Sequence, residues 1–335
     1  ILHSLGQRPT VMNGAVMKNF ATTDGPFASA LVGDPDLFVS EVDESDGSIA
    51  LYSPTLALLN NVSLDHKEMD ELRSLFTGFL QAATIAVVNV DDEESRSLSG
   101  EVAGVVGYGF DQPDAGVRGL DLSLDAEGSR FTLAVEGQRH FVRLPLPGRH
   151  NASNALGALA AVHALGADLP AAVDALSRFA GLKRRLETVG QAAGVRVIDD
   201  FAHNPDKIAA TLATLAAGEG RLLLMFQPHG YGPLAKMGGE LASTFAEGLR
   251  PDDLLILSDP VYQGGTVDRS RGSDWLAEAV RQAGGRAEHI PDRQAIAERL
   301  LAEARSGDTI AILGARDDTL SLFAADLVRN LGGRG

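Results

Sequence analysis

The sequence predicts an α/β protein of two domains, each built around a mostly parallel sheet with crossover helices. Short apolar runs alternate with amphipathic helical patterns through most of the chain, which is the order typical of βαβ units. A length of 335 residues is enough for two domains. The alternation starts afresh at about Gly181, so we expect one domain in residues 1–180 and a second in residues 181–335.

In the first half, apolar runs of strand length surround one clear helical pattern. The expected strands are Leu37–Val42, Leu56–Asn60 and Thr84–Asn89. Between the last two, Met69–Ala83 places large apolar side chains on one face, which predicts an amphipathic helix.

The period of the pattern changes after residue 116. Val117–Leu124, Arg130–Val135 and His140–Leu146 alternate apolar and polar residues between glycine-containing turns, which predicts a small antiparallel meander. Two helices follow, one over Asn151–Leu165 and one that opens after Pro170, a proline that suits a first helical turn.

The second half repeats the α/β alternation. Its expected strands are short apolar runs: Val195–Asp199, Arg221–Phe226, Asp253–Ser258, Ala287–Ile290 and Asp308–Leu313. Helical patterns lie between them, and a last one covers Leu320–Leu331. This order predicts a Rossmann-like, doubly wound domain. No Gly-x-Gly-x-x-Gly follows its first strand, which argues against nicotinamide binding.

The composition excludes several functional classes. Acidic residues outnumber basic ones by 45 to 29, and a formal net charge of −16 repels nucleic acids and anionic membranes. The absence of cysteine excludes disulfides, thiolate metal sites and cysteine nucleophiles, and it fits a cytoplasmic location. The longest nearly apolar run, Ala155–Ala167, contains a histidine and is too short to cross a bilayer. We therefore expect neither a nucleic acid nor a membrane as a partner.

Two polar clusters follow the first two expected strands, where open parallel sheets bind ligands. Glu41–Asp46 follows the first strand and Asn60–His66 follows the second. A carboxylate from one and an imidazole from the other could share a divalent cation, and magnesium suits such a sparse site because water and phosphate oxygens complete its octahedron. In the alternative interpretation, Glu44 and Asp46 cap a helix and His66 is a surface residue.

A third cluster, Pro147–Ala155, opens a helix. Asn151 and Asn154 lie on one face of its first turns, and an amide can both donate to and accept from a purine edge. The alternative interpretation is that Asn151 caps the helix and Asn154 is solvated.

A fourth cluster lies at the start of the second domain. Lys183, Arg184 and Arg185 are consecutive, and two arginines beside a domain boundary can bind phosphates bidentately. Asp199–Pro205 combines the end of a strand, a turn and the start of a helix, and adjacent aspartates there suit a ribose hydroxyl. As an alternative, the basic triplet is a solvated linker.

Together these motifs resemble those of the Mur ligase family. The sequence carries Glu-Val-Asp-Glu-Ser-Asp-Gly-Ser, Asn-Asn-Val-Ser-Leu-Asp-His, Pro-Gly-Arg-His-Asn-x-x-Asn-Ala, Lys-Arg-Arg-Leu-Glu and Asp-Asp-Phe-Ala-His-Asn-Pro, in the order and spacing of that family. Phe226–His229 further resembles the alanine-adding members. The resemblance covers nearly the whole chain.

The resemblance implies a domain organisation and a reaction. Family members have a UDP-sugar domain, a central P-loop-type ATPase domain and a Rossmann-like C-terminal domain, so residues 1–180 would be the central domain and residues 181–335 the C-terminal one. They use ATP and Mg²⁺ to phosphorylate a substrate carboxylate, and an amine then attacks the acyl phosphate to give an amide, ADP and phosphate. The implied partners are small molecules: ATP, an amino acid and a carboxylate acceptor.

For the central domain, the resemblance implies two pairs of site residues. Glu41 and His66 would bind magnesium, and Asn151 and Asn154 would meet the adenine side of ATP.

For the C-terminal domain, the resemblance implies catalytic and nucleotide-binding roles. Arg185 would contact phosphate, Asp200 and His203 would complete the nucleotide site, and His229 would lie near the incoming amine. Arg185, His203 and His229 would thus be the catalytic residues.

The chain departs from the family pattern in three places. It has no Gly-x-x-Gly-Lys-Ser/Thr loop to cradle the ATP phosphates. Because it starts at Ile1, and residues 1–10 resemble the helix after that loop, we expect the loop and the UDP-sugar domain to lie upstream and this chain alone not to turn over ATP. Gly230–Pro233 replaces the usual Arg-Tyr-Ser-Arg after His229, and Arg316 stands where the family tends to have glycine.

The sequence leaves three functions open. The first is a cell-wall ligase that adds an amino acid to a UDP-muramic acid type precursor in peptidoglycan biosynthesis. The second is a relative that acts on a folate or poly-amino-acid acceptor, since His203-Asn204-Pro205 also resembles folylpolyglutamate synthases. The third is a non-catalytic nucleotide-binding or partner-binding module without the loop. A Gly-Lys-Ser/Thr encoded just upstream would favour an enzyme.

Overall fold

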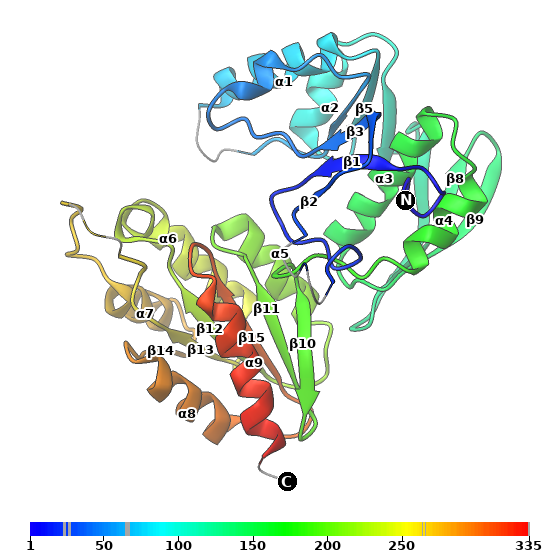
Figure 1. Ribbon diagram of the computed structural model, residues 1–335. Helices are drawn as coiled ribbons and strands as arrows, with labels where there is room; N and C mark the ends of the chain where they lie inside the picture. Colours follow the sequence, from blue (N-terminus) through cyan, green and yellow to red (C-terminus); the bar gives the residue numbers. More distant parts are fainter. Residues whose placement is uncertain (23–24, 26–27, 64–67, 263, 265, 334–335) are drawn as a thin grey trace. The chain divides into compact units, whose positions relative to one another are not determined.

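The computed structural model describes the chain except residues 23–24, 26–27, 64–67, 263, 265 and 334–335. The described chain divides into two compact units, Ile1–Ala180 (the first unit) and Gly181–Gly335 (the second unit), shown in Figure 1. Each unit contains a parallel-rich sheet with helices on both faces, which confirms the predicted α/β class.

A six-stranded sheet forms the centre of the first unit. Its order is β4-β5-β6-β7-β8-β9. The bounds are β4 (Leu56–Leu59), β5 (Ile85–Asn89), β6 (Val106–Gly109), β7 (Val117–Leu124), β8 (Ser129–Val135) and β9 (Gln138–Leu144). The first four strands are parallel, and β7, β8 and β9 form the predicted antiparallel meander. The meander is continuous with the main sheet because β7 also pairs with β6.

Helices cover both faces of this sheet (Figure 1). On one face, α1 (Met69–Ala82) and α2 (Glu93–Ser99) bury Leu72, Leu80 and Leu98 against β4 and β5. On the other face, α3 (Arg149–Ala164) and α4 (Leu169–Ser177) pack on β5 to β9. The glycine and alanine residues of α3 let this helix approach the sheet closely.

A second, small sheet in the first unit changes one expectation. Its order is β2-β1-β3, with β1 (Pro9–Met12), β2 (Ala30–Leu31) and β3 (Asp34–Ser40), and a 3₁₀ helix, η1 (Ser48–Leu51), follows it. The first expected strand therefore lies in a different sheet from β4, so the first two polar clusters do not follow strands of one sheet. The apolar residues that predicted the strand are not core residues, since Phe38 and Val39 are 56% and 41% exposed.

The start of the chain is not the helix that the sequence suggested. Residues 2–6 form turns, in which the Leu5 amide donates to the Ile1 carbonyl, and the strand β1 begins at Pro9. Gly6 has a φ of 81°, which ends the turns, and a proline at position 9 disfavours helical geometry in the residue before it.

Besides β1 and β2, two strands were not predicted from the sequence, β6 and β10 (Glu187–Ala192), both of which have weak strand composition. In β6, two of four residues are glycine, and both stand where a side chain does not fit: a Cβ at Gly109 would lie 2.4 Å from the Asp91 carboxylate, and one at Gly107 would lie 3.0 Å from Val90. The strand β10 lies at the edge of its sheet and pairs antiparallel with β11.

The second unit is built on a six-stranded sheet with the order β10-β11-β15-β12-β13-β14. The further strands are β11 (Val195–Asp200), β12 (Leu222–Gln227), β13 (Leu254–Leu257), β14 (Ala287–His289) and β15 (Thr309–Gly314). These five strands are parallel, so their carboxyl ends lie along one edge.

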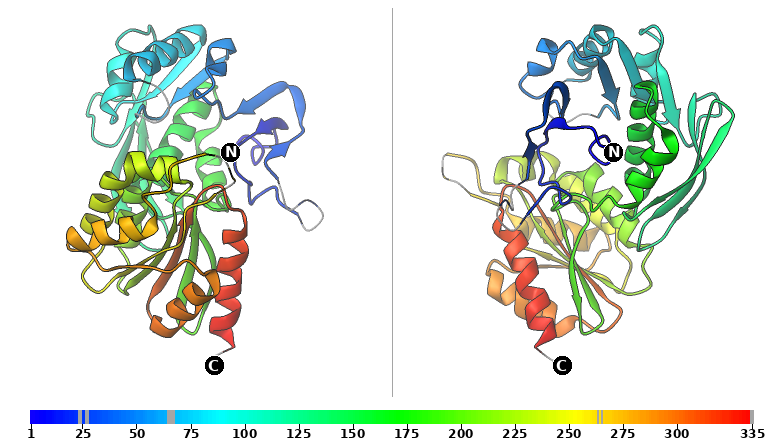
Figure 2. Two further views of the ribbon diagram at one scale, coloured as in Figure 1. Left: turned by 90° about the vertical axis from the view of Figure 1, so that its left-hand side faces the viewer. Right: turned by 45° about the vertical axis from the view of Figure 1, so that its right-hand side comes forward.

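Helices on both faces make this second sheet doubly wound, as predicted. Figure 2 shows α8 (Arg293–Glu303) and α9 (Thr319–Gly332) on one face. The other face is covered by α5 (Pro205–Leu215), α6 (Tyr231–Gly248) and α7 (Ser273–Gln282). The strands between them are fully apolar at their centres, as in β12, where all six residues are buried.

The close approach of α3 to β6 makes Gly157 a sensitive position. A Cβ there would lie 2.7 Å from the Oη and Cζ atoms of Tyr108, which is itself fully buried. We expect Gly157→Ala to lower the free energy of unfolding of the first unit by about 1–3 kcal/mol through overpacking. Urea denaturation measures this.

Gly78→Ala is the matched control because Gly78 is an exposed glycine in α1 with no atom within 4 Å of an added Cβ. It should leave stability unchanged or raise it by about 0.5–1 kcal/mol. Equal effects of the two substitutions would contradict the packing argument.

Candidate functional site

Side chains at the carboxyl edge of the first unit form a hydrogen-bond relay that starts in the core. The buried Tyr108 hydroxyl of β6 donates to Asn60 Oδ1 at 2.6 Å, and Asn60 Nδ2 donates to Asn154 Oδ1 at 2.8 Å. Burial, followed by the charges of Asp91 and Asp92, raises the pKa of Tyr108, so its hydroxyl keeps its proton. The relay fixes the exposed amide of Asn154 and brings the second and third predicted clusters together.

Asn151 is held by a different contact. Its Nδ2 donates to the Pro147 carbonyl at 2.7 Å, and the residue is partly buried. The cap of α3 is Gly148, with a φ of 99° and no side-chain capping bond, so the alternative that Asn151 caps this helix is wrong. These bonds use Nδ2 of Asn151 and Oδ1 of Asn154, and they leave Oδ1 of Asn151 as an acceptor and Nδ2 of Asn154 as a donor.

Asp91 is a residue of this edge that the sequence analysis did not select. Its carboxylate follows β5 and accepts hydrogen bonds from the backbone amides of Phe110 (2.6 Å), Asp111 (2.9 Å) and Gln112 (3.2 Å). Arg149 at the start of α3 donates to Asp111 at 2.6 Å. The rule that singled out residues after the other strands would have found Asp91, because it also follows a predicted strand.

The predicted magnesium pair is only half described. Glu41 follows β3, is exposed, and accepts a hydrogen bond from the Gly14 amide at 2.6 Å through Oε2. His66 lies outside the described residues. The described part of the chain holds no group of three or more His, Asp or Glu side chains arranged for a metal ion. The pairing of Glu41 with His66 thus stays a prediction.

Asp46 takes part in local structure. Its Oδ1 accepts from the Ser48 amide at 2.8 Å, at the start of η1, whose N-cap residue is Gly47. Because the cap of η1 is Gly47 and makes no side-chain capping bond, the interpretation that Asp46 caps a helix is wrong, and Asp46 stabilises the turn before η1.

In the second unit, Arg184 ties together the ends of two adjacent strands. Its Nη2 donates to the Gly314 carbonyl at 2.6 Å, its Nη1 lies 3.3 Å from Asp318, and its Nε lies 3.5 Å from Asp199 Oδ1. Asp199 is fully buried and also accepts from the Ser321 hydroxyl. Arg184 is thus a buried structural cation, and the interpretation of the basic triplet as a solvated linker is wrong for it.

Asp200, the next residue of β11, is also buried. Its Oδ2 accepts from the Thr211 hydroxyl at 2.6 Å, and the amides of Leu186 and Phe201 donate to the same carboxylate. Burial raises the pKa of both Asp199 and Asp200 despite these bonds. The structure places the Asp200 carboxylate beneath the surface, where it holds the following turn.

The remaining predicted residues of the second unit lie at its carboxyl edge. The rings of His203, after β11, and His229, after β12, meet edge to face with centroids 4.8 Å apart. His203 Nδ1 lies 2.9 Å from the Phe201 carbonyl, so Nδ1 carries the proton and Nε2 is the basic nitrogen. The exposed Arg185 guanidinium stacks 4.9 Å above the Phe201 ring.

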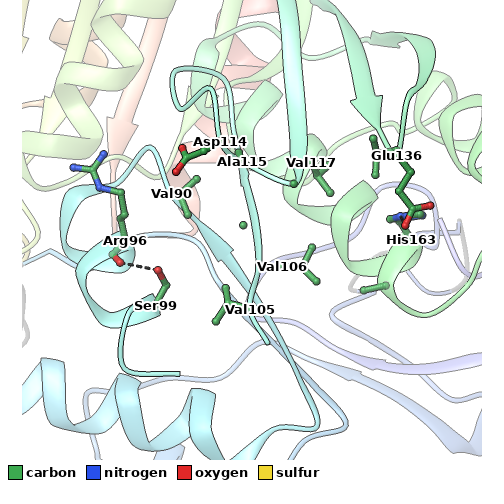
Figure 3. A pocket seen from close by; sticks show the side chains of 14 residues that line it. Val90, Arg96, Ser99, Val105, Val106, Asp114, Ala115, Val117, Glu136 and His163 are labelled. Carbon is green, nitrogen blue, oxygen red and sulfur yellow. Dashed lines mark hydrogen bonds and ion pairs between the residues drawn. The ribbon is translucent and has the colours of Figure 1, made fainter. Parts of the chain in front are cut away.

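A crevice of about 730 Å³ in the first unit lies apart from these residues (Figure 3). Five valine side chains around β6 and β7 line it, with Arg96 and Asp114 toward one end and His163 facing Glu136 at the other. No residue with a predicted chemical role lines it.

Among the described residues, no helix is long and apolar enough to span a membrane.

Two family models match the chain. The Mur ligase middle domain matches residues 21–162, and the glutamate ligase domain of Mur ligases matches residues 184–316.

Curated relatives carry the name UDP-N-acetylmuramate–L-alanine ligase. The protein of Clavibacter michiganensis is 34% identical over 93% of this chain and 65% of its own length. The protein of Streptomyces coelicolor is 35% identical over 88% of this chain and 66% of its own length. The protein of Streptomyces avermitilis is 34% identical over 95% of this chain and 69% of its own length. The chain thus spans about two thirds of the length of these relatives.

Solved structures show the same fold. UDP-N-acetylmuramate-alanine ligase of Thermotoga maritima superposes with a TM-score of 0.80 at 22% identity, over 100% of this chain and 71% of that one. The MurF ligase of Thermotoga maritima, solved in complex with ADP, superposes with a TM-score of 0.73 at 15% identity, over 100% of this chain and 76% of that one.

The histidine at the start of α3 gives the first unit a pH dependence. Burial lowers the pKa of His150 below its ordinary value of 6.5 in the folded protein. The unfolded chain then binds the proton at a higher pH than the folded chain, so stability decreases as the pH falls through 6.5. We expect the free energy of unfolding to drop more in the wild type than in His150→Gln between about pH 8 and about pH 5. Urea titrations of both proteins measure this, and the same change in the free energy of unfolding with pH in the wild type and in His150→Gln would refute it.

Proposed function

The chain belongs to the Mur ligase family, and from this premise we propose that its two units are the central and C-terminal domains of an ATP-dependent ligase. The ligase joins an amine to a carboxylate through an acyl phosphate, and it adds an amino acid to a UDP-muramic acid type precursor of the cell wall. Relatives at 34–35% identity that carry the alanine-ligase name support this acceptor class. The requirement for ATP and a nucleotide-linked substrate places the activity in the cytoplasm.

The observation that carries the proposal is the meeting of His203 and His229 at the carboxyl edge of the second sheet, with Arg185 exposed beside the same turn. Parallel α/β sheets bind substrates at this edge. Phosphoryl transfer depends on positioning and on positive charge rather than on a protein nucleophile, and an always-charged guanidinium supplies that charge.

In this proposal, four residues of the second unit have separate roles. Arg185 binds a phosphate group, because its guanidinium is exposed and its Cζ lies 4.9 Å from the centre of the Phe201 ring. His229 lies next to the amine, and the His203 ring orients the His229 ring. His203, whose Nε2 is basic, helps to accept the proton that the amine loses on attack. Asp200 acts from below by fixing the turn that carries His203.

The amides of Asn151 and Asn154 fit an adenine ring. Asn151 retains Oδ1 as an acceptor, and Asn154 retains Nδ2 as a donor. Adenine offers the complementary set, a donor amino group beside ring-nitrogen acceptors. The relay from Tyr108 through Asn60 orients Asn154, so we add Asn60 as a positioning residue of the nucleotide site.

Magnesium would be held by Glu41 and His66. Glu41 fits this part because it is an exposed carboxylate whose second oxygen, Oε1, lies outside its bond to Gly14, and carboxylate oxygen is a ligand that magnesium prefers. The ion would neutralise charge on the phosphate groups.

The 335-residue chain by itself is expected not to turn over ATP. No Gly-x-x-Gly-Lys-Ser/Thr occurs in it, so the backbone cradle and the lysine that hold the ATP phosphates in the family are missing from this sequence. ADP release by the purified chain, measured with a coupled assay in the presence of magnesium and all common amino acids, should not exceed the blank. Release at a rate of about 1 per second or faster would contradict the expectation.

The ligase proposal is tested on the complete product of the gene that encodes this chain. We expect ADP release that depends on one amino acid and on a UDP-muramic acid type acceptor. Arg185→Ala should lower kcat by about 100-fold or more, because it removes a charge that stabilises the transition state.

The matched control is Arg329→Ala, an exposed arginine in the last turn of α9, away from the carboxyl edge. It should leave kcat within about twofold, as for most surface substitutions. Full activity of Arg185→Ala would remove Arg185 from the site, and the lack of any amino-acid-dependent ADP release would refute the ligase.

A further inference from the structure

A backbone outlier stands at the carboxyl end of β15, the strand between β11 and β12. Arg316 has a φ of 64°, in the left-handed region that disfavours residues with a side chain. It lies two residues beyond the end of the strand, in the turn before α9. Such a conformation persists only where its surroundings impose it, and it occurs preferentially at functional positions.

The residues on both sides of Arg316 are held firmly. Before it, the Gly314 carbonyl accepts from Arg184 at 2.6 Å. After it, Asp317 accepts from Arg293 at 2.7 Å and from the Thr319 amide at 3.0 Å. These contacts fix the path of the turn, so Arg316 has to adopt the left-handed conformation and its side chain leaves the turn in a set direction.

The strand order places Arg316 after the strand that lies between those preceding the two histidines. Leu313 pairs with Asp200 on one side and with Phe226 on the other, so these three residues form one row across β11, β15 and β12. Counting three residues past this row reaches His203, Arg316 and His229. Flanking strands lie about 10 Å apart, two strand spacings, yet the histidine rings approach to 4.8 Å. The histidine rings therefore approach each other from the two strands that flank the strand preceding Arg316.

The charge of Arg316 is not neutralised within the described part of the protein. The side chain is exposed, and no described residue hydrogen-bonds or ion-pairs with it. The two carboxylates next to it in sequence are engaged elsewhere, Asp317 by Arg293 and Asp318 by Arg184. A cation is thus presented at the end of the strand between those that precede His203 and His229, while the two adjacent carboxylates contact structural partners.

We propose that Arg316 binds the carboxylate of the incoming amine substrate and so selects amines that carry one, such as α-amino acids. The proposal rests on the ligase function given above. An α-amino acid that places its amine beside His229 holds its carboxylate two bonds away, within reach of a guanidinium at the next strand end. A guanidinium binds a carboxylate bidentately, which also fixes the direction from which the amine attacks.

The test uses steady-state kinetics of the complete gene product, with separate KM values for the amine substrate and for ATP. Arg316→Gly removes the charge and suits the left-handed backbone. We expect its KM for the amino acid to rise about tenfold or more, with the KM for ATP unchanged within about twofold. Arg316→Lys keeps the charge in the same backbone and should lose less. For the amide of the same amino acid, which lacks the carboxylate, wild type and Arg316→Gly should have equal KM values.

Thermal unfolding separates this role from a structural one. Arg316→Gly should unfold at the same temperature as the wild type or about 2–4 °C higher, because strain is relieved. Arg329→Ala controls for the loss of an arginine and should leave both KM values unchanged. An unchanged KM for the amino acid overturns the proposal, and so does a raised KM for ATP, which would assign Arg316 to phosphate; in either case the ligase stands. The lack of amino-acid-dependent ADP release in the wild type would instead overturn the ligase function and this proposal with it.

Discussion

The buried side chain of Arg184 holds together the edge on which the chemistry of the second unit depends. It joins Asp199 at the end of β11 to the Gly314 carbonyl at the end of β15. A buried carboxylate without its cation is strongly unfavourable, so the strand ends and the arginine fix one another. The neighbouring Arg185 is exposed. Two adjacent arginines thus have separate tasks, one structural and one available to a ligand.

In the first unit, neutral groups hold the carboxyl edge of the sheet in place. Its carboxyl edge is positioned by a phenol in the core, which orients Asn60 and through it Asn154. Gly157 is required because only a residue without a side chain lets α3 come this close to Tyr108. In both units a buried polar group from the sheet determines where an exposed one lies, which keeps the exposed group preorganised without burying it. Under the proposed function this arrangement suits phosphoryl transfer, in which catalysis depends on positioning and on electrostatic stabilisation.

Much of this could be predicted from the sequence, because buried parallel strands and amphipathic helices leave strong patterns. β7 was bounded correctly, and the predicted residues His203 and His229 do lie after the ends of β11 and β12, where their rings meet. The failures have physical causes. Glycines that β6 needs for close packing erase its strand signal, and the exposed apolar residues of β3 imitate those of a core strand. The roles of Asp200 and Arg184 depend on burial, which local sequence does not reveal, and the left-handed backbone of Arg316 follows from contacts with distant residues.

The central claim is that the carboxyl edge of the second sheet receives the amine substrate between His203, His229 and Arg316. A crystal structure of the complete gene product with ADP and its amino acid tests this most directly. The account requires the amino group beside His229 and both carboxylate oxygens within hydrogen-bonding distance of the Arg316 guanidinium, about 2.7–2.9 Å. An amino acid bound away from this edge, or bound there with Arg316 turned to solvent, would contradict it.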